Sequence, residues 1–455
     1  FNMYYQYSYE KDYLSEFSDQ GEALDKLETG TDLAVLKTGD ESVYRYDQMG
    51  THSYENSSMQ TGTNGTSYYF SVASGDITNF FNEVDLNTPW DYHYENLDSR
   101  TILDRLAAVK YFVVKAGEEE YLPYGYDTLA AEVEKNDKLY RAYECKNALP
   151  IGYTYDSYIP EEKYAKMSTV EKQQALLQGV ILSNSTVPET TSEFNDREVP
   201  YKLVTGSGCR EKDGKLIVTK ENAQAKLVFD GLDECETYLI TEGVDYEALS
   251  PRELISDKKW SKMTLYEQKK IQYENSTWRY WKESQKAYID VTGQFLDKTI
   301  SIFTDKYNAY SGRSDFLCNT GYSVKRKKSI TLTFENTGVY SYKNMKVVCQ
   351  PIENIESQTT KLRAESLENV EIKNHELTGN ISVSKDKVLV ISLPYSKGFQ
   401  AYVDGQKTEL KQANTMYMAL ELKKGAHEIR LTYCTPYLKA GLILTCAGVL
   451  CYICV

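Results

Sequence analysis

The chain has 455 residues, of which 41% are hydrophobic and 26% are charged. These proportions are typical of globular domains and exclude a disordered chain, and the length is enough for about three domains. The formal net charge of −14 excludes a protein that holds nucleic acid by neutralising its phosphates. The 40 tyrosines fit either a surface that stacks on sugar rings or the codon usage of an AT-rich genome.

The N-terminal part of the chain predicts a mixed α/β unit. Residues 1–20 are polar and aromatic and are typical of a juxtamembrane segment, whereas residues 21–190 alternate between helix and strand patterns. Asp76 and Asp98 are each expected to cap a short amphipathic helix. A strand is expected over Val109–Lys115, directly after the second of these helices.

Two segments share a helix-start pattern. Ser168-Thr-Val-Glu171 and Thr264-Leu-Tyr-Glu267 both place a hydroxyl residue three positions before a glutamate. In this capping box the hydroxyl and the carboxylate each accept a hydrogen bond from an otherwise unpaired helix amide. A helix is therefore expected to begin at the second residue of each segment.

Short alternating strands dominate from about residue 199 onward, so the whole chain is expected to be an α+β protein. Residues 191–350 predict a β-sandwich of the jelly-roll or immunoglobulin-like kind, with a helical insertion near 250–285. Residues 351–435 predict a second β-sandwich, which begins with a charged, irregular segment up to residue 378.

A hairpin is expected near the end of the second sandwich. Phe399–Val403 alternates apolar and polar side chains, and Asp404-Gly405 follows it directly. This dipeptide accepts the positive φ angles of a type I′ turn.

The C-terminal segment is apolar, and residues 440–455 carry no charge. A membrane-spanning helix needs about 20 apolar residues. Residues 436–455 are therefore interpreted as a truncated transmembrane helix, which would make the chain a fragment of a longer membrane protein. The alternative is a buried C-terminal core helix.

The sequence contains no recognised catalytic motif, such as a nucleophile elbow, a P-loop or a zinc-binding HExxH. The four histidines are too widely separated to suggest a metal site. Neither a catalytic nor a metal-ligating residue is therefore predicted.

The best candidate for a ligand surface is a short aromatic stretch, Trp90, Asp91, Tyr92 and His93. Aromatic rings can stack on the C–H faces of sugars, while the carboxylate and imidazole can fix hydroxyl groups. The alternative is a structural loop that Trp90 pins to the core.

Two further predictions concern a pair of cysteines and a run of basic residues. Cys209 and Cys235 could form a disulfide outside the cell, although free thiols fit the sequence equally well. The basic run at 325–328 is expected to be a solvated turn that leads into a strand.

Three stretches carry a resemblance to a known family. They are Leu-Asp-Arg-Leu-Ala-Ala-Val-Lys-Tyr-Phe-Val-Val at 103–114, residues 149–158 with 171–177, and the closing hairpin at 395–405 with 424–429. In these stretches and in their order, the chain resembles the extracytoplasmic portion of the YfhO family of bacterial multi-pass membrane proteins, over essentially its whole length.

The resemblance implies a polytopic glycosyltransferase of the GT-C-like type. Such an enzyme takes a sugar from a polyprenyl-phosphate carrier, and its acceptor is a cell-envelope polymer such as lipoteichoic acid. The catalytic carboxylate is then expected in a loop outside this chain, so no catalytic residue carries over.

The resemblance also implies a location and a role for this part of the protein. Residues 1–435 would lie on the extracytoplasmic face of the bacterial plasma membrane, where they would recognise the acceptor or cover the transfer site. The alternative is a non-enzymatic, membrane-anchored module that binds carbohydrate, adheres or serves as a scaffold. Neither nucleic acid nor a further cofactor is expected, and the oligomeric state stays open.

Overall fold

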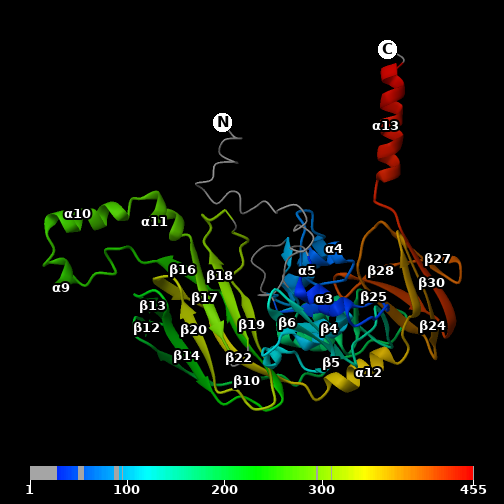
Figure 1. Cartoon of the computed structure of the whole chain (residues 1–455), viewed down its shortest axis with the longest axis horizontal. Helices are drawn as coiled ribbons and strands as arrows, with labels where there is room; N and C mark the ends of the chain where they lie inside the picture. The colour runs from blue at the N-terminus through cyan, green and yellow to red at the C-terminus, as the bar shows by residue number, and fades with distance from the viewer. Residues whose placement is uncertain are drawn as a thin grey trace.

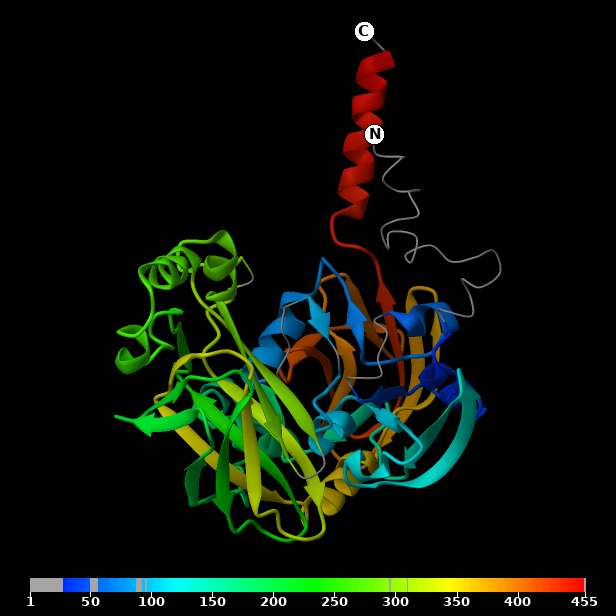
Figure 2. The same cartoon turned by 60° about the vertical axis from the view of Figure 1, so that its left-hand side comes forward.

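Antiparallel strands in several sheets, with helices between and around them, make the protein an α+β structure (Figures 1 and 2). The computed structural model describes residues 28–49, 56–86, 92–94, 96–293, 296–308 and 310–453. The prediction of an α+β protein is confirmed, whereas its division into two β-sandwiches stays a prediction.

The N-terminal unit is built on a mixed four-stranded sheet in the order β1-β4-β6-β5, in which the β1–β4 pair is parallel. One face packs against α3, because Ala34 and Val35 of that helix meet Tyr111 and Val113 of β4 in a small core. The opposite face packs against α6 in the largest core of the molecule. The elements are α3 (Gly30–Leu36), β1 (Arg45–Gln48), α6 (Thr101–Leu106), β4 (Val109–Lys115), β5 (Tyr126–Lys135) and β6 (Lys138–Cys145).

The two aspartates predicted as helix caps are not caps. Helix α5 (Gly75–Glu83) has Ser74 at its N-cap and Asp76 in its first turn. Helix α6 has Arg100 at its N-cap. Asp98 instead has a positive φ of 61° and receives a hydrogen bond from the backbone amide of Asn319, so a tertiary contact replaces the local one.

Both predicted capping boxes are confirmed. Helix α8 (Thr169–Leu176) begins with the reciprocal hydrogen bonds of Ser168 and Glu171, and α10 (Leu265–Glu274) begins with those of Thr264 and Glu267. These helices start at the expected residues because the signal is local to one turn.

The middle of the chain folds into three antiparallel sheets around one core. Their strand orders are β10-β22-β15-β19, β11-β14-β20-β17-β18 and β12-β13-β21-β16. In β14 every second residue is buried, as a half-solvated strand requires. The strands are β10 (Arg197–Val199), β11 (Tyr201–Thr205), β12 (Cys209–Lys212), β13 (Lys215–Val218), β14 (Ala223–Phe229), β15 (Cys235–Glu242), β16 (Asp245–Ala248), β17 (Lys286–Thr292), β18 (Asp297–Phe303), β19 (Phe316–Ser323), β20 (Ser329–Phe334), β21 (Gly338–Ser341) and β22 (Asn344–Pro351).

A helical arm leaves this unit between β16 and β17, where an insertion was expected (Figure 1). It consists of α9 (Asp257–Trp260), α10 and α11 (Trp278–Glu283). The arm is tied together by Gln268, whose side-chain amide donates to the backbone carbonyls of Trp260 and Met263.

The C-terminal strands form two sheets in the orders β23-β24-β30-β26-β27 and β28-β29-β25-β7. Strand β7 (Gly152–Tyr155) comes from the N-terminal unit and pairs antiparallel with β25 (Lys387–Pro394). The core between the sheets contains Leu389, Leu420 and Leu431. The other strands are β23 (Glu368–Lys373), β24 (Glu376–Val383), β26 (Phe399–Val403), β27 (Gln406–Thr408), β28 (Lys411–Ala413), β29 (Tyr417–Leu422) and β30 (Gly425–Tyr433).

Two local expectations in this region have opposite outcomes. The type I′ turn is confirmed, since Asp404 and Gly405 have φ angles of 53° and 77°. The segment up to 378 is not irregular: it contains α12 (Ile355–Arg363) and β23. Helix α12 buries Ile355, Thr359 and Leu362, whose helical spacing is masked by charged neighbours.

The basic run at 325–328 is not simply a solvated turn. Lys327 is 1% exposed, and its ammonium group donates to the backbone carbonyls of Thr320 and Gly321. Burial lowers the pKa of Lys327 to about 8.

The cysteines Cys209 and Cys235 are both buried free thiols. The thiol of Cys235 donates to the backbone carbonyl of Leu232 and lies 3.7 Å from the hydroxyl of Thr237, which lies 3.9 Å from the thiol of Cys349 on the neighbouring strand β22.

Helix α13 (Leu438–Ile453) projects alone from the end of the chain, and none of its residues is buried (Figure 1). Among the described residues, no helix combines the length and apolar character that a membrane crossing requires. The assignment of residues 436–455 as a truncated transmembrane helix stays a prediction.

Candidate ligand-binding site

The structure brings the predicted ligand residues Tyr92 and His93 to one short two-stranded ladder, formed by β2 (Tyr68–Tyr69) and β3 (His93–Tyr94). Tyr92 is 40% exposed, and its ring meets the ring of Tyr69 edge-on at 5.6 Å. The ring of His93 lies 6.4 Å from the same tyrosine. Trp90 and Asp91 lie outside the described residues.

Tyr94 holds this ladder to the core. Its ring is fully buried and packs edge-on against Phe81 at 4.7 Å, and at a tilt of 34° against Tyr68 at 4.6 Å. Its hydroxyl group lies 3.1 Å from that of Thr78. Tyr94 thus anchors the ladder to the core and leaves Tyr92 at the surface, while both interpretations of Trp90 stay predictions.

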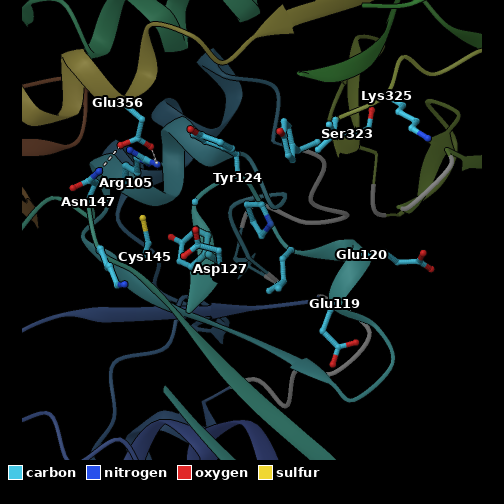
Figure 3. A pocket seen from close by; sticks show the side chains of 17 residues that line it. Arg105, Glu119, Glu120, Tyr124, Asp127, Cys145, Asn147, Ser323, Lys325 and Glu356 are labelled. Carbon is cyan, nitrogen blue, oxygen red and sulfur yellow. Dashed lines mark hydrogen bonds and ion pairs between the residues drawn. The ribbon is translucent and has the colours of Figure 1, made fainter. Parts of the chain in front are cut away.

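A larger candidate site is a cavity of about 920 Å³ (Figure 3). It lies where three parts of the chain meet: the N-terminal sheet unit, the end of β19 with the turn that follows it, and the first turn of α12. Ligand sites occur preferentially at such junctions. The lining residues that bear polar or charged side chains are Arg105, Glu119, Glu120, Tyr124, Tyr126, Asp127, Cys145, Lys146, Asn147, Tyr322, Ser323, Lys325 and Glu356.

One end of the cavity is organised by a buried guanidinium group. Arg105 has no exposed surface, and one of its terminal nitrogens donates to Glu356 at 2.5 Å, while the other lies 3.4 Å from the hydroxyl of Thr359. Asn147 donates to the other oxygen of the Glu356 carboxylate, also at 2.5 Å. Partial burial opposes ionisation of Glu356, but the Arg105 guanidinium outweighs it and lowers the pKa of the carboxyl group.

Gly125 allows this arginine to lie where it does. Its φ is +90°, and a Cβ atom there would come within 2.5 Å of a terminal nitrogen of Arg105. Glycine is thus required at this position both by its backbone angle and by the close approach of the guanidinium group.

Two tyrosines form the aromatic wall of the cavity. Tyr124 and Tyr322 meet edge-on with ring centroids 5.2 Å apart, and the Arg105 guanidinium lies 5.7 Å from the Tyr124 ring centre. Both side chains are half-buried, so each keeps part of its ring toward the cavity. Burial raises the pKa of both hydroxyl groups, which keeps them neutral hydrogen-bonding groups at physiological pH.

The outer part of the cavity carries charges of both signs. Glu119 is engaged by Arg141 at 2.6 Å. Among the described residues no ion pair involves Glu120, Lys146 or Lys325, all of which are exposed. In Figure 3, Glu119, Glu120 and Lys325 lie away from the cluster of Arg105, Asn147 and Glu356.

Cys145 lines the cavity but is not a reactive group. The thiol is buried, and this burial raises its pKa. A nucleophilic cysteine requires a lowered pKa and access, so Cys145 is a packing residue here.

Buried polar contacts beneath the cavity fix α6, the helix that carries Arg105. The backbone amide and hydroxyl of Thr101 both donate to Glu236 of β15, at 3.0 and 2.5 Å. The hydroxyl of Tyr238 donates to the other oxygen of that carboxylate. Arg100 donates from Nε to Gln173 of α8 at 2.9 Å. These contacts join the N-terminal unit to the middle sheets and hold the walls of the cavity in place.

A pair of carboxyl groups lies in the same buried layer. Asp47 accepts hydrogen bonds from the backbone amide of Leu97 and the hydroxyl of Thr66. Asp104 faces Asp47, and burial together with this neighbouring carboxylate raises its pKa well above the ordinary value. Asp104 is therefore expected to keep its proton at neutral pH.

Sequence reasoning missed the cavity residues because they are distant in the chain. Arg105 and Glu356 are 251 residues apart, and no motif links them. The one available signal was the composition of α6, where Arg105 follows Ile102, Leu103 and Asp104 in a largely buried helix, although arginine is otherwise expected at the surface.

The family model described as "Bacterial membrane protein YfhO" matches residues 1–445. The uncharacterized protein YfhO of Bacillus subtilis (strain 168) is 22% identical to this chain over 420 residues. That match covers 91% of this chain and 43% of the relative, so the chain spans less than half of the relative's length.

One solved structure is also similar in part. It is a cryo-EM structure of a mutant of the arabinofuranosyltransferase AftD from Mycobacteria, at 11% sequence identity and a TM-score of 0.14. The match covers 33% of this chain and 12% of that one.

Proposed function

Because the chain belongs to the YfhO family of bacterial membrane proteins, we propose that it is the extracytoplasmic accessory part of a membrane glycosyltransferase. In this proposal the whole protein transfers a sugar from a polyprenyl-phosphate carrier to a cell-envelope polymer such as lipoteichoic acid. The described cavity binds the acceptor polymer and presents it to a transfer site elsewhere in the protein, at the outer face of the plasma membrane.

The observation that carries the proposal is the mixed lining of the cavity. The half-buried rings of Tyr124 and Tyr322 offer apolar faces of the kind that pack on the C–H faces of sugars or glycerol. Asp127 and Glu120 offer acceptors for hydroxyl groups, because both are exposed carboxylates of the lining.

The two exposed lysines of the lining could also bind the phosphate groups of an acceptor polymer. Lys146 and Lys325 can attract the phosphodiester groups of a polymer such as poly(glycerol phosphate). This pair matters because the chain as a whole carries a net charge of −14 and would repel a polyanion elsewhere.

A binding experiment tests the proposal directly. The double variant Lys146→Gln/Lys325→Gln should weaken binding of poly(glycerol phosphate), measured by isothermal titration calorimetry, by about fivefold to 30-fold at low salt. The matched control Lys220→Gln/Lys226→Gln changes two exposed lysines of the middle sheets and should leave the affinity unchanged. Equal losses in the two double variants would show nonspecific charge attraction and contradict the proposal.

A second measurement uses the full-length protein in cells. Tyr322→Ala should reduce glycosylation of the envelope polymer, whereas Tyr322→Phe, which keeps the ring, should retain most of it. Tyr92→Ala tests the exposed aromatic ladder in the same assay. If Tyr322→Ala is expressed, folds and glycosylates normally, the cavity does not bind the acceptor.

A further inference from the structure

The helical arm presents an exposed face that no other described part of the chain covers. None of the residues of α10 is buried. Leu265, Tyr266 and Tyr273 are 72%, 78% and 70% exposed, which are large fractions for apolar and aromatic side chains.

Helix geometry places these side chains on one side of α10. At about 100° per residue, Leu265, Lys269, Tyr273, Tyr266 and Lys270 fall within one sector of about 140°. The acidic residues of the helix, Glu267 and Glu274, and the half-buried Ile271 fall outside that sector. Helix α10 thus has an aromatic and basic face and a separate acidic edge.

The arm carries a local excess of positive charge in an acidic protein. Its six lysines are all exposed, and among the described residues no ion pair involves them: Lys258, Lys259, Lys262, Lys269, Lys270 and Lys282. Two of its acids are already engaged, since Asp257 pairs with Arg252 at 2.7 Å and Glu267 closes the capping box of α10.

The arm and α13 belong to the same end of the molecule. Figures 1 and 2 differ by a turn about the vertical axis, and in both views α10 and α11 lie toward the end from which α13 projects. Helix α13 is apolar and wholly exposed, and the family is one of membrane proteins.

From these observations we propose that α10 docks on the headgroup layer of an anionic lipid bilayer, on the side of the molecule from which α13 leaves. Tyr266 and Tyr273 lie at the depth where aromatic side chains favour a membrane interface, and Leu265 reaches the acyl boundary. The lysines contact anionic headgroups. This surface is separate from the cavity and does not depend on glycan binding.

Hydrogen exchange of the whole chain tests this docking where it should occur. Amides of residues 265–274 are expected to exchange at least about fivefold more slowly on vesicles of equimolar phosphatidylglycerol and phosphatidylcholine than on phosphatidylcholine alone. The hairpin of β12 and β13 serves as an internal control and should not change. The protection should be lost at high salt.

Two double variants sharpen the test. Lys269→Glu/Lys270→Glu should abolish the protection on anionic vesicles, because each lysine near such a surface strengthens binding about fivefold. The matched control Lys215→Glu/Lys226→Glu, on the middle sheets, should retain it. Circular dichroism of each variant checks that the fold is intact.

Three results would overturn the proposal. The first is no protection of 265–274 on anionic vesicles, and the second is equal protection on neutral vesicles. The third is protection without vesicles that grows with protein concentration, since that would place a second copy of the chain on this face.

Discussion

Replacing Glu356 with glutamine is expected to lower the free energy of unfolding by about 2–3 kcal/mol at neutral pH. The variant keeps the size of the side chain but removes the charge that faces Arg105, which has no exposed surface. Loss of one partner from a fully buried ion pair costs about 3–5 kcal/mol. The side chain of Glu356 is 33% exposed, so water replaces part of the lost interaction and the smaller range applies.

The pH dependence of this loss follows from the pKa of Glu356. The ion pair lowers that pKa below the ordinary 4.5, so the pair stabilises the folded state above the unfolded value. The contribution disappears as the pH falls through the lowered pKa. The difference between wild type and Glu356→Gln should therefore be full at pH 7 and should shrink progressively below about pH 4.5.

Urea denaturation followed by circular dichroism measures these differences. A double-mutant cycle with Arg105→Met isolates the pair, and we expect a coupling free energy of about 1–2 kcal/mol. A loss below about 0.5 kcal/mol in Glu356→Gln, or one that does not change between pH 7 and pH 3, would refute the reasoning.

Three further changes test the buried charges and the closing turn. Asp104→Asn should be more stable than wild type by at least about 1 kcal/mol at pH 8, and this advantage should vanish near pH 4. The reason is that a carboxyl group whose pKa is raised in the folded state stabilises that state only below its unfolded pKa. Denaturation at several pH values across this range measures the difference, and a constant difference would show that Asp104 holds no extra proton. The free energy of unfolding of the wild type should rise by roughly 3 kcal/mol relative to that of Lys327→Met between pH 8 and 10.5, because in this range only the unfolded lysine keeps its proton. If the two proteins show the same dependence of stability on pH, the pKa of Lys327 is not lowered. Gly405→Val should lower the free energy of unfolding by about 1–2 kcal/mol through backbone strain alone, since a Cβ atom there meets nothing within 4 Å. Gly405→Asn should have nearly the stability of the wild type, because asparagine accepts a positive φ. Equal melting temperatures of the two variants would argue against the assigned turn.

Local signals in the sequence were sufficient for many of the elements. The capping boxes before α8 and α10 and the turn at Asp404 and Gly405 depend on hydrogen bonds or φ angles within four residues. Strand β4 was predicted with its observed bounds, Val109–Lys115, because its short run is rich in β-branched and aromatic residues.

Tertiary contacts account for what could not be predicted. Lys327 lies within a basic run, and its burial depends on carbonyl groups at Thr320 and Gly321 that only the folded turn presents. Asp98 was expected to cap a helix, but its carboxylate instead accepts a hydrogen bond from the backbone amide of Asn319, which is 221 residues away in the chain. The cavity has the same origin, since its walls come from segments that the chain order keeps apart.

Strand β7 has a consequence for how the protein reaches its native state. Ser392 of β25 donates to the carbonyl of Ile151, across 241 residues of chain. During synthesis, the edge of β7 therefore stays unpaired until nearly the last strands have been made, so slow folding with a late closing step is expected. A shortened version that ends before residue 387 would keep that edge open and ready to pair with another chain.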